Sequence, residues 1–131
     1  MPSRKIEDLH PDLQPLAKEF IRLCALKQCD VLIICTYRSN EEQAELYSQG
    51  RSKPGKIVTH APPGSSKHNF TVDGKPAAKA FDVVPLVDGK AEWNTGSPKW
   101  KIIGEVARFL RLQWGGDWAS FKDYPHVELL S

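Results

Sequence analysis

Residues 80–85, Ala80-Phe81-Asp82-Val83-Val84-Pro85, form an apolar run with the character of a β-strand and contain a single acid. β-Branched and aromatic residues favour a pleated, half-buried strand. One carboxylate is costly to bury in such a strand unless it is paired. A metal ion would remove that cost, so the stretch predicts a strand that presents Asp82 to a metal.

Two histidines outside this strand complete a set of ligands. His68 precedes the strand, His126 follows it, and Asp123 lies three residues before His126. A catalytic zinc takes three protein ligands and keeps a fourth position open for water. Asp123 is then a spare carboxylate, close enough in sequence to His126 to act as the catalytic general base. The pattern predicts a zinc peptidase with His68, Asp82 and His126 as metal ligands.

Further segments give the chain a resemblance to a known family. They are Ser66-Lys67-His68, Ala80-Phe81-Asp82, Asp123-Tyr124-Pro125-His126, Tyr37-Arg38-Ser39, Gln43, Leu46-Tyr47, Gly50-Arg51, Pro54-Gly55, Ile57-Val58-Thr59 and Trp114-Gly115-Gly116-Asp117-Trp118. On these segments the chain resembles the zinc D-alanyl-D-alanine carboxypeptidase and L-alanyl-D-glutamate endopeptidase family of cell-wall enzymes, and within it the short phage endolysins. The resemblance covers most of the chain. It implies a small α+β domain of the hedgehog/DD-peptidase type, with an antiparallel sheet, flanking helices and a zinc site.

The chain departs from the family in one place. Family members have a Gly-x-Ala-x-Asp segment soon after the first histidine, whereas residues 70–79 intervene here. Val72-Asp73-Gly74-Lys75 is a turn signature, because Asp-Gly tolerates the positive φ angles of tight hairpins. We therefore predict a small hairpin with Asp73 at its exposed tip. Asp82 is the expected acidic ligand, and Asp73 is the alternative.

Arg38 is a candidate for binding substrate. It lies where a predicted strand, residues 31–35, gives way to a predicted helix. A guanidinium there can form a bidentate pair with a carboxylate, and peptidoglycan stem peptides are rich in carboxylates. The resemblance favours this role, because Tyr37-Arg38-Ser39 matches the family at its substrate-contacting position. The alternative is an ion pair that stiffens the loop, with Glu41, Glu42 or Asp117 as partner.

Several other polar and aromatic residues are secondary candidates. Ser66 lies two residues before His68, and in an extended strand both side chains would share one face, so its hydroxyl could reach substrate or a metal ligand. His60 lies in a loop rich in Pro, Gly and Ser, where it could touch substrate. His10 is expected to cap a helix. Asp117 is expected either to orient an imidazole or to be a surface acid, and one of two tryptophans, Trp114 or Trp118, could line the cleft.

Periodicity and capping signals predict the other elements. We expect one helix over 12–28, a second that starts at the Ser39/Glu42 capping box and ends at Gln49, and a third that starts at Ser97-Pro98. We also expect a long loop over 51–67 and a terminal strand at 126–130.

Composition narrows the class of protein. A chain of 131 residues suits one domain, so we expect residues 1–131 to form a single catalytic domain with no separate wall-binding module. The 18 basic and 16 acidic residues give a net charge of +2 without a basic stripe, so nucleic acid is not an expected partner. Cys24, Cys29 and Cys35 lack a metal-binding spacing and are expected to be buried free thiols. The sequence predicts neither a signal peptide nor membrane insertion.

The resemblance implies a function. It is that of a phage endolysin, expected to be a monomer, which hydrolyses the L-alanyl-D-glutamate bond of bacterial peptidoglycan and so lyses the host. Such an enzyme is made in the host cytoplasm and reaches the periplasmic peptidoglycan through a separate, holin-like phage protein. The alternatives are a D-alanyl-D-alanine carboxypeptidase or dipeptidase, and a non-enzymatic zinc-containing binding module. Asp123 at the catalytic spacing argues against the non-enzymatic alternative.

Overall fold

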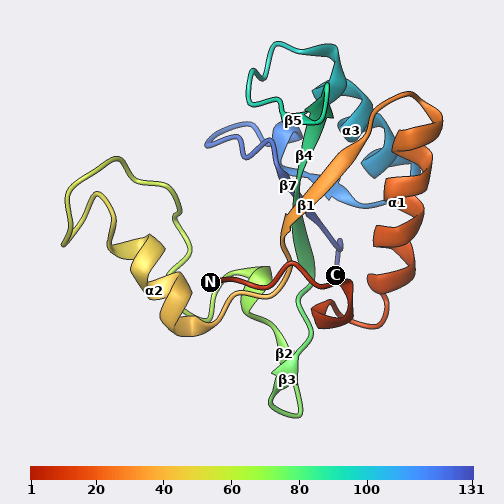
Figure 1. Ribbon diagram of the computed structural model, residues 1–131. Helices are drawn as coiled ribbons and strands as arrows, with labels where there is room; N and C mark the ends of the chain where they lie inside the picture. Colours follow the sequence, from red (N-terminus) through yellow and green to blue (C-terminus); the bar gives the residue numbers. More distant parts are fainter.

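The computed structural model describes residues 1–131 and is organised around an antiparallel sheet (Figure 1). The strands are β1 (Val31–Cys35), β2 (Thr71–Val72), β3 (Lys75–Pro76), β4 (Ala80–Val87), β5 (Lys90–Ala91), β6 (Gln113–Trp114) and β7 (His126–Glu128). The α-helices are α1 (Gln14–Leu26), α2 (Asn40–Ser48) and α3 (Pro98–Phe109), and short 3₁₀ helices span Ile6–Asp8, Lys67–Asn69 and Gly115–Asp117. None of the helices combines the length and apolarity needed to cross a membrane.

Strand β4, the predicted one, lies inside the main sheet. The strand order is β1-β4-β7-β6, and β5 pairs with the end of β4. Asp82 stands opposite Cys35 on β1 and opposite His126 on β7. Directly opposed residues of antiparallel strands bring their side chains together on one face. The register therefore places Asp82 between a thiol and an imidazole.

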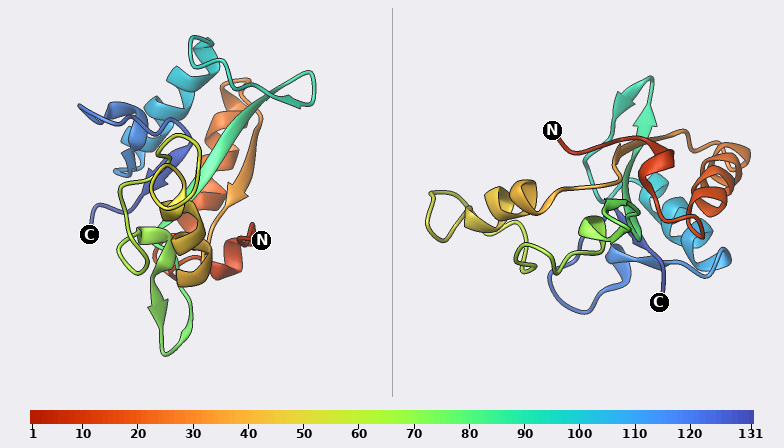
Figure 2. Two further views of the ribbon diagram at one scale, coloured as in Figure 1. Left: turned by 90° about the vertical axis from the view of Figure 1, so that its left-hand side faces the viewer. Right: turned by 90° about the horizontal axis from the view of Figure 1, so that it is seen from below.

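The two faces of the sheet serve different purposes. Helices α1 and α3 cover one face, while α2 and the loop that follows it extend away on the other side (Figures 1 and 2). Phe81 on β4 packs edge-on against Phe20 of α1, with ring centroids 5.4 Å apart, and both side chains are fully buried. Because side chains alternate along a strand, Asp82 faces away from this core.

Local signals in the sequence produce the expected elements. The Ser39 hydroxyl accepts the Glu42 N–H at 3.0 Å and the Glu42 carboxylate accepts the Ser39 N–H at 2.8 Å, so the predicted capping box starts α2. Asp73 and Gly74 have φ angles of 53° and 75°, as a tight hairpin turn requires. The elements are shorter than predicted: α1 begins at Gln14 with a proline in its first turn, and β7 ends at Glu128. All three cysteines are buried free thiols, as predicted.

Gly104 on α3 lies directly against the Trp114 ring, so a substitution at this position tests the packing of the core. A Cβ at this position would come within 2.5 Å of the Trp114 ring. Gly→Ala in an exposed helix stabilises it by up to about 1 kcal/mol. Here we expect Gly104→Ala to lower the free energy of unfolding by about 1–3 kcal/mol, because the indole has to move. Urea unfolding measures the change, with Lys101→Ala on the exposed side of α3 as control, and a Gly104→Ala variant as stable as the parent would contradict this packing.

Candidate metal centre

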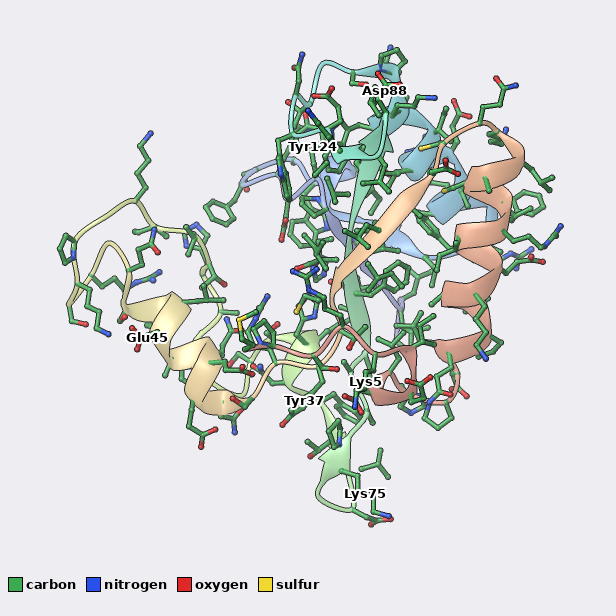
Figure 3. All side chains as sticks on the ribbon, viewed as in Figure 1. Lys5, Tyr37, Glu45, Lys75, Asp88 and Tyr124 are labelled. Atoms are coloured by element: carbon green, nitrogen blue, oxygen red, sulfur yellow. The ribbon has the colours of Figure 1, made fainter.

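The three predicted ligands meet at one point. Asp82 Oδ1 lies 3.1 Å from His68 Nε2 and 3.4 Å from His126 Nδ1. The imidazoles come from the 3₁₀ helix after the long loop and from β7, and both are buried. Asp73, the alternative ligand, is at the exposed tip of the β2–β3 hairpin, whose far end is marked by Lys75 in Figure 3. The structure therefore places Asp82, and not Asp73, beside the histidines.

Each imidazole is held on its outer edge by an acceptor. His68 Nδ1 lies 2.7 Å from the Thr36 carbonyl oxygen, and His126 Nε2 lies 2.7 Å from Glu128 Oε1. A carbonyl and a carboxylate only accept, so these nitrogens carry the protons. In neutral imidazoles the other nitrogens then direct lone pairs at the Asp82 carboxylate, which is repulsive. A cation between them removes the repulsion, so the donor set fits a metal ion.

In the metal-free chain, the pKa shifts of the two histidines and of Asp82 also indicate that positive charge is favoured beside Asp82. Burial alone would lower the pKa of His68 and of His126, but the Asp82 carboxylate outweighs burial and raises the pKa of both. Burial alone would raise the pKa of Asp82, yet the two imidazoles hold it well below its usual range. Protons on the imidazoles supply the charge that Asp82 requires. A metal cation would supply it in their place.

Asp123 borders the cluster. Its Oδ2 lies 3.9 Å from His126 Nδ1, the nitrogen that also faces Asp82, and its side chain is 43% exposed. Burial and then the charge of Asp82 raise the pKa of Asp123. The Asp123 N–H donates to the Gly115 carbonyl at 3.1 Å, and a Cβ on Gly115 would meet the Asp123 carbonyl oxygen at 2.1 Å. Only glycine allows this close approach, which fixes the backbone beside Asp123.

Arg38 contacts the cluster of candidate ligands directly. Its Nη2 lies 3.6 Å from Asp82 Oδ2, and its Nη1 donates to Gln43 Oε1 at 2.9 Å. It pairs with none of the acids considered from the sequence. Asp117, one of those acids, instead accepts through both carboxylate oxygens from Arg108 Nη1, at 3.0 and 2.9 Å, on the surface. Asp117 is therefore a surface acid that orients no imidazole.

Ser66 has the extended backbone considered from the sequence, but His68 lies in a 3₁₀ helix and not in the same strand. Ser66 is the N-cap of this helix, because its hydroxyl accepts the His68 N–H at 3.1 Å. The Asn69 side chain accepts the Ser66 N–H at 3.2 Å in return. The hydroxyl thus contacts the backbone of a candidate ligand and helps to fix its position.

A cleft of about 530 Å³ opens over the cluster. The loop after α2 forms one wall and residues 118–123 form another. Across the mouth, His60 and Phe121 pack edge-on with ring centroids 4.1 Å apart. Trp118 lines the cleft and lies 5.2 Å from the His126 ring, whereas Trp114 is buried in the core. His10 accepts the Asp12 N–H in the turn before α1, but the N-cap of that helix is Leu13 and no side chain caps it, so the expected capping role is not found.

Cys35 and Glu128 border the site although the sequence analysis assigned them no part in it. The donor atoms of Cys35, His68 and Asp82 lie within 4.8 Å of one another and form an alternative metal-binding group. However, Cys35 Sγ is 3.7 Å from Nδ1 of His68, the nitrogen engaged by Thr36. The sequence signal for Glu128 was its spacing of two residues from His126 on a strand, which puts both side chains on one face.

Comparisons with known proteins agree with this geometry. Residues 59–129 match the family model described as D-alanyl-D-alanine carboxypeptidase. The peptidoglycan L-alanyl-D-glutamate endopeptidase CwlK of Bacillus subtilis is 41% identical over 124 residues, which cover 94% of this chain and 74% of CwlK. An L-alanyl-D-glutamate peptidase from a Listeria phage is 29% identical over 100 residues, 76% of this chain and 30% of that protein.

Among solved structures, the L-Ala D-Glu endopeptidase ChiX of Serratia marcescens has a TM-score of 0.59 and 21% identity, covering 98% of this chain and 88% of ChiX. This likeness confirms the predicted α+β fold.

Metal content separates the two candidate ligand groups. We expect His126→Ala to lose the bound metal, because it removes a ligand, whereas Cys35→Ala and Asp73→Ala should each retain about one ion per chain. Elemental analysis of the purified variants measures this. Loss of metal from Cys35→Ala together with retention in His126→Ala would assign the site to the cysteine-containing group.

Proposed function

The chain belongs to the D-alanyl-D-alanine carboxypeptidase family of peptidases, and from that membership we propose that it is a zinc enzyme that cleaves the L-alanyl-D-glutamate bond of peptidoglycan. Membership makes the chain a metallopeptidase. The convergence of His68, Asp82 and His126 beside Asp123 is the observation that carries the proposal. The names of CwlK and of the phage relative support the choice of bond.

The proposed metal ligands are His68 Nε2, Asp82 Oδ1 and His126 Nδ1. When bound there, a zinc ion supplies Lewis-acid chemistry that activates water and polarises the scissile carbonyl. The Thr36 carbonyl and Glu128 keep the two imidazoles in the tautomers that such binding requires. The side chains are thus arranged for the metal before it binds.

Asp123 is the proposed general base. Its carboxylate faces the cleft beside His126, where it can take a proton from the attacking water and return it to the departing amine. Burial and the charge of Asp82 raise its pKa, which makes the Asp123 carboxylate a stronger base toward the attacking water. Such a role contributes typically about 10²- to 10⁴-fold in rate.

Arg38 and Ser66 are the proposed substrate-binding residues, and both line the cleft. Arg38 lies beside Asp82 in this cleft, where the charge of its guanidinium can attract a carboxylate of the stem peptide. The Ser66 hydroxyl oxygen accepts the backbone N–H of His68, and its hydroxyl hydrogen is left to donate to a substrate in the cleft that Ser66 lines.

The biological role we propose is that of an endolysin. Residues 1–131 would act as one catalytic domain, as a monomer, on the peptidoglycan of a host in whose cytoplasm the protein is made. A separate holin-like protein would provide access to the wall. The phage relative supports this role, since an L-alanyl-D-glutamate peptidase similar to this chain is encoded by a Listeria phage.

The nature of the products tests the bond that is cleaved. Digestion of purified peptidoglycan should free stem peptides that begin with D-glutamate and leave L-alanine on the glycan, as mass spectrometry would detect. The description of the family model favours a second candidate, a D-alanyl-D-alanine carboxypeptidase. Release of terminal D-alanine alone would favour that candidate and contradict the endopeptidase.

The role of Asp123 is tested by Asp123→Asn, which is nearly isosteric and leaves the three ligands in place. We expect zinc content to be unchanged and peptidoglycan hydrolysis to fall by about 10²-fold or more, because the proton acceptor is lost. Zinc and rate are measured on the same preparation. Near-normal hydrolysis would exclude Asp123 as base, and loss of zinc would make it a ligand.

A further inference from the structure

The outer edge of His126 contacts a carboxylate that is itself held by a lysine. Glu128 Oε1 lies 2.7 Å from His126 Nε2, and Glu128 Oε2 lies 2.8 Å from Lys67 Nζ. Lys67 also donates to the Leu129 carbonyl. The Glu128 side chain is only 13% exposed, so the contacts are shielded from water. This chain of contacts joins β7 to the 3₁₀ helix that carries His68.

Carboxylates lie at both ring nitrogens of His126, so each nitrogen has an acceptor for the imidazole proton. Nδ1 faces two carboxylates, Asp82 at 3.4 Å and Asp123 at 3.9 Å, and either would attract a proton to that nitrogen. A neutral imidazole protonated on Nδ1 has no lone pair there for a metal. Glu128 is the group on the opposite edge that holds the proton on Nε2.

The two histidines differ in the group that accepts from the outer ring nitrogen. His68 is held by a backbone carbonyl, that of Thr36, which no side-chain substitution removes. His126 depends on a side chain, and that side chain depends on Lys67 for its orientation. Carboxylates that accept from a metal-bound imidazole typically contribute about 10- to 100-fold to metal affinity.

We propose that Glu128, oriented by Lys67, is a positioning residue that holds His126 as the Nε2–H tautomer and so prepares Nδ1 to bind the metal. This inference rests on the proposed zinc site. It extends that site to a lysine–glutamate pair on the edge of His126 that faces away from Asp82, with the Lys67 side chain 29% exposed and the Glu128 side chain 13% exposed. The pair also links the two ligand-bearing segments, because Lys67 precedes His68 and Glu128 lies two residues after His126.

Zinc affinity, measured by competition with a chromophoric chelator, tests the inference without an activity assay. Glu128→Ala should bind zinc about 10- to 100-fold more weakly than the parent. Asp117→Ala is the matched control, because it removes the same charge from a surface acid paired with Arg108, and its affinity should be unchanged. Circular dichroism of the metal-free variants establishes that the fold is retained.

A second pair of variants tests the part of Lys67 and remains informative if Glu128→Ala does not fold. In Glu128→Gln one end of the side chain is an amide N–H₂, which conflicts with one of the two donors, His126 or Lys67. Adding Lys67→Met removes that conflict and leaves the amide oxygen free for His126. We expect the double variant to bind zinc more tightly than Glu128→Gln alone.

The outcomes separate this inference from the proposed function. A parent protein that binds no zinc contradicts the proposed function. A parent that binds zinc, with Glu128→Ala binding equally tightly, overturns only the role of Glu128. Equal affinities of Glu128→Gln and the double variant overturn the role of Lys67.

Discussion

The charge of Asp82 is the constraint on which the rest of the site depends. Its carboxylate lies on a strand inside the sheet and is only 16% exposed, so water does little to stabilise it. Removing a carboxylate from water costs several kcal/mol unless compensating charge surrounds it. Two imidazoles and the Arg38 guanidinium provide that charge, and they come from separate segments of the chain. The need to compensate one acid thus brings together the groups that can hold a cation.

The two faces of the sheet have different roles, because one carries the hydrophobic core and the other carries the candidate site. On one face, α1 and α3 bury an aromatic and aliphatic core against β4, and this core contains no acidic or basic side chain. On the other face, the side chains that alternate with the core residues form the floor of the cleft, and loops form its walls. Ligands on regular strands are held more precisely than ligands on loops. His126 and Asp82 have this support, while His68 obtains it from the Ser66 cap and the Thr36 carbonyl.

Local patterns predicted much of this structure because the relevant contacts lie close together in sequence. The Ser39 capping box, the Asp73-Gly74 turn and the apolar strand around Asp82 each involve neighbouring residues, and each formed. Among contacts between distant segments, the meeting of His68, Asp82 and His126 was predicted, whereas those of Cys35 and Arg38 with Asp82 were missed. The pairing of Cys35 with Asp82 depends on the register of β1 against β4, and the bond between Arg38 and Asp82 joins different elements. Ser66 and His68 were expected on one strand because side chains two residues apart share a face of a strand. The same spacing also separates the N-cap from the second residue of a 3₁₀ helix, and this is the arrangement in the structure.

The central claim is that a single metal ion binds between His68, Asp82 and His126, with Asp123 beside it. A crystal structure of the zinc-loaded protein, with anomalous diffraction recorded on both sides of the zinc absorption edge, tests this most directly. The account predicts one anomalous peak bonded to His68 Nε2, His126 Nδ1 and the Asp82 carboxylate, with Asp123 outside the coordination shell. A peak bonded to the Cys35 sulfur and His68 Nδ1, or no peak between the histidines, would contradict it.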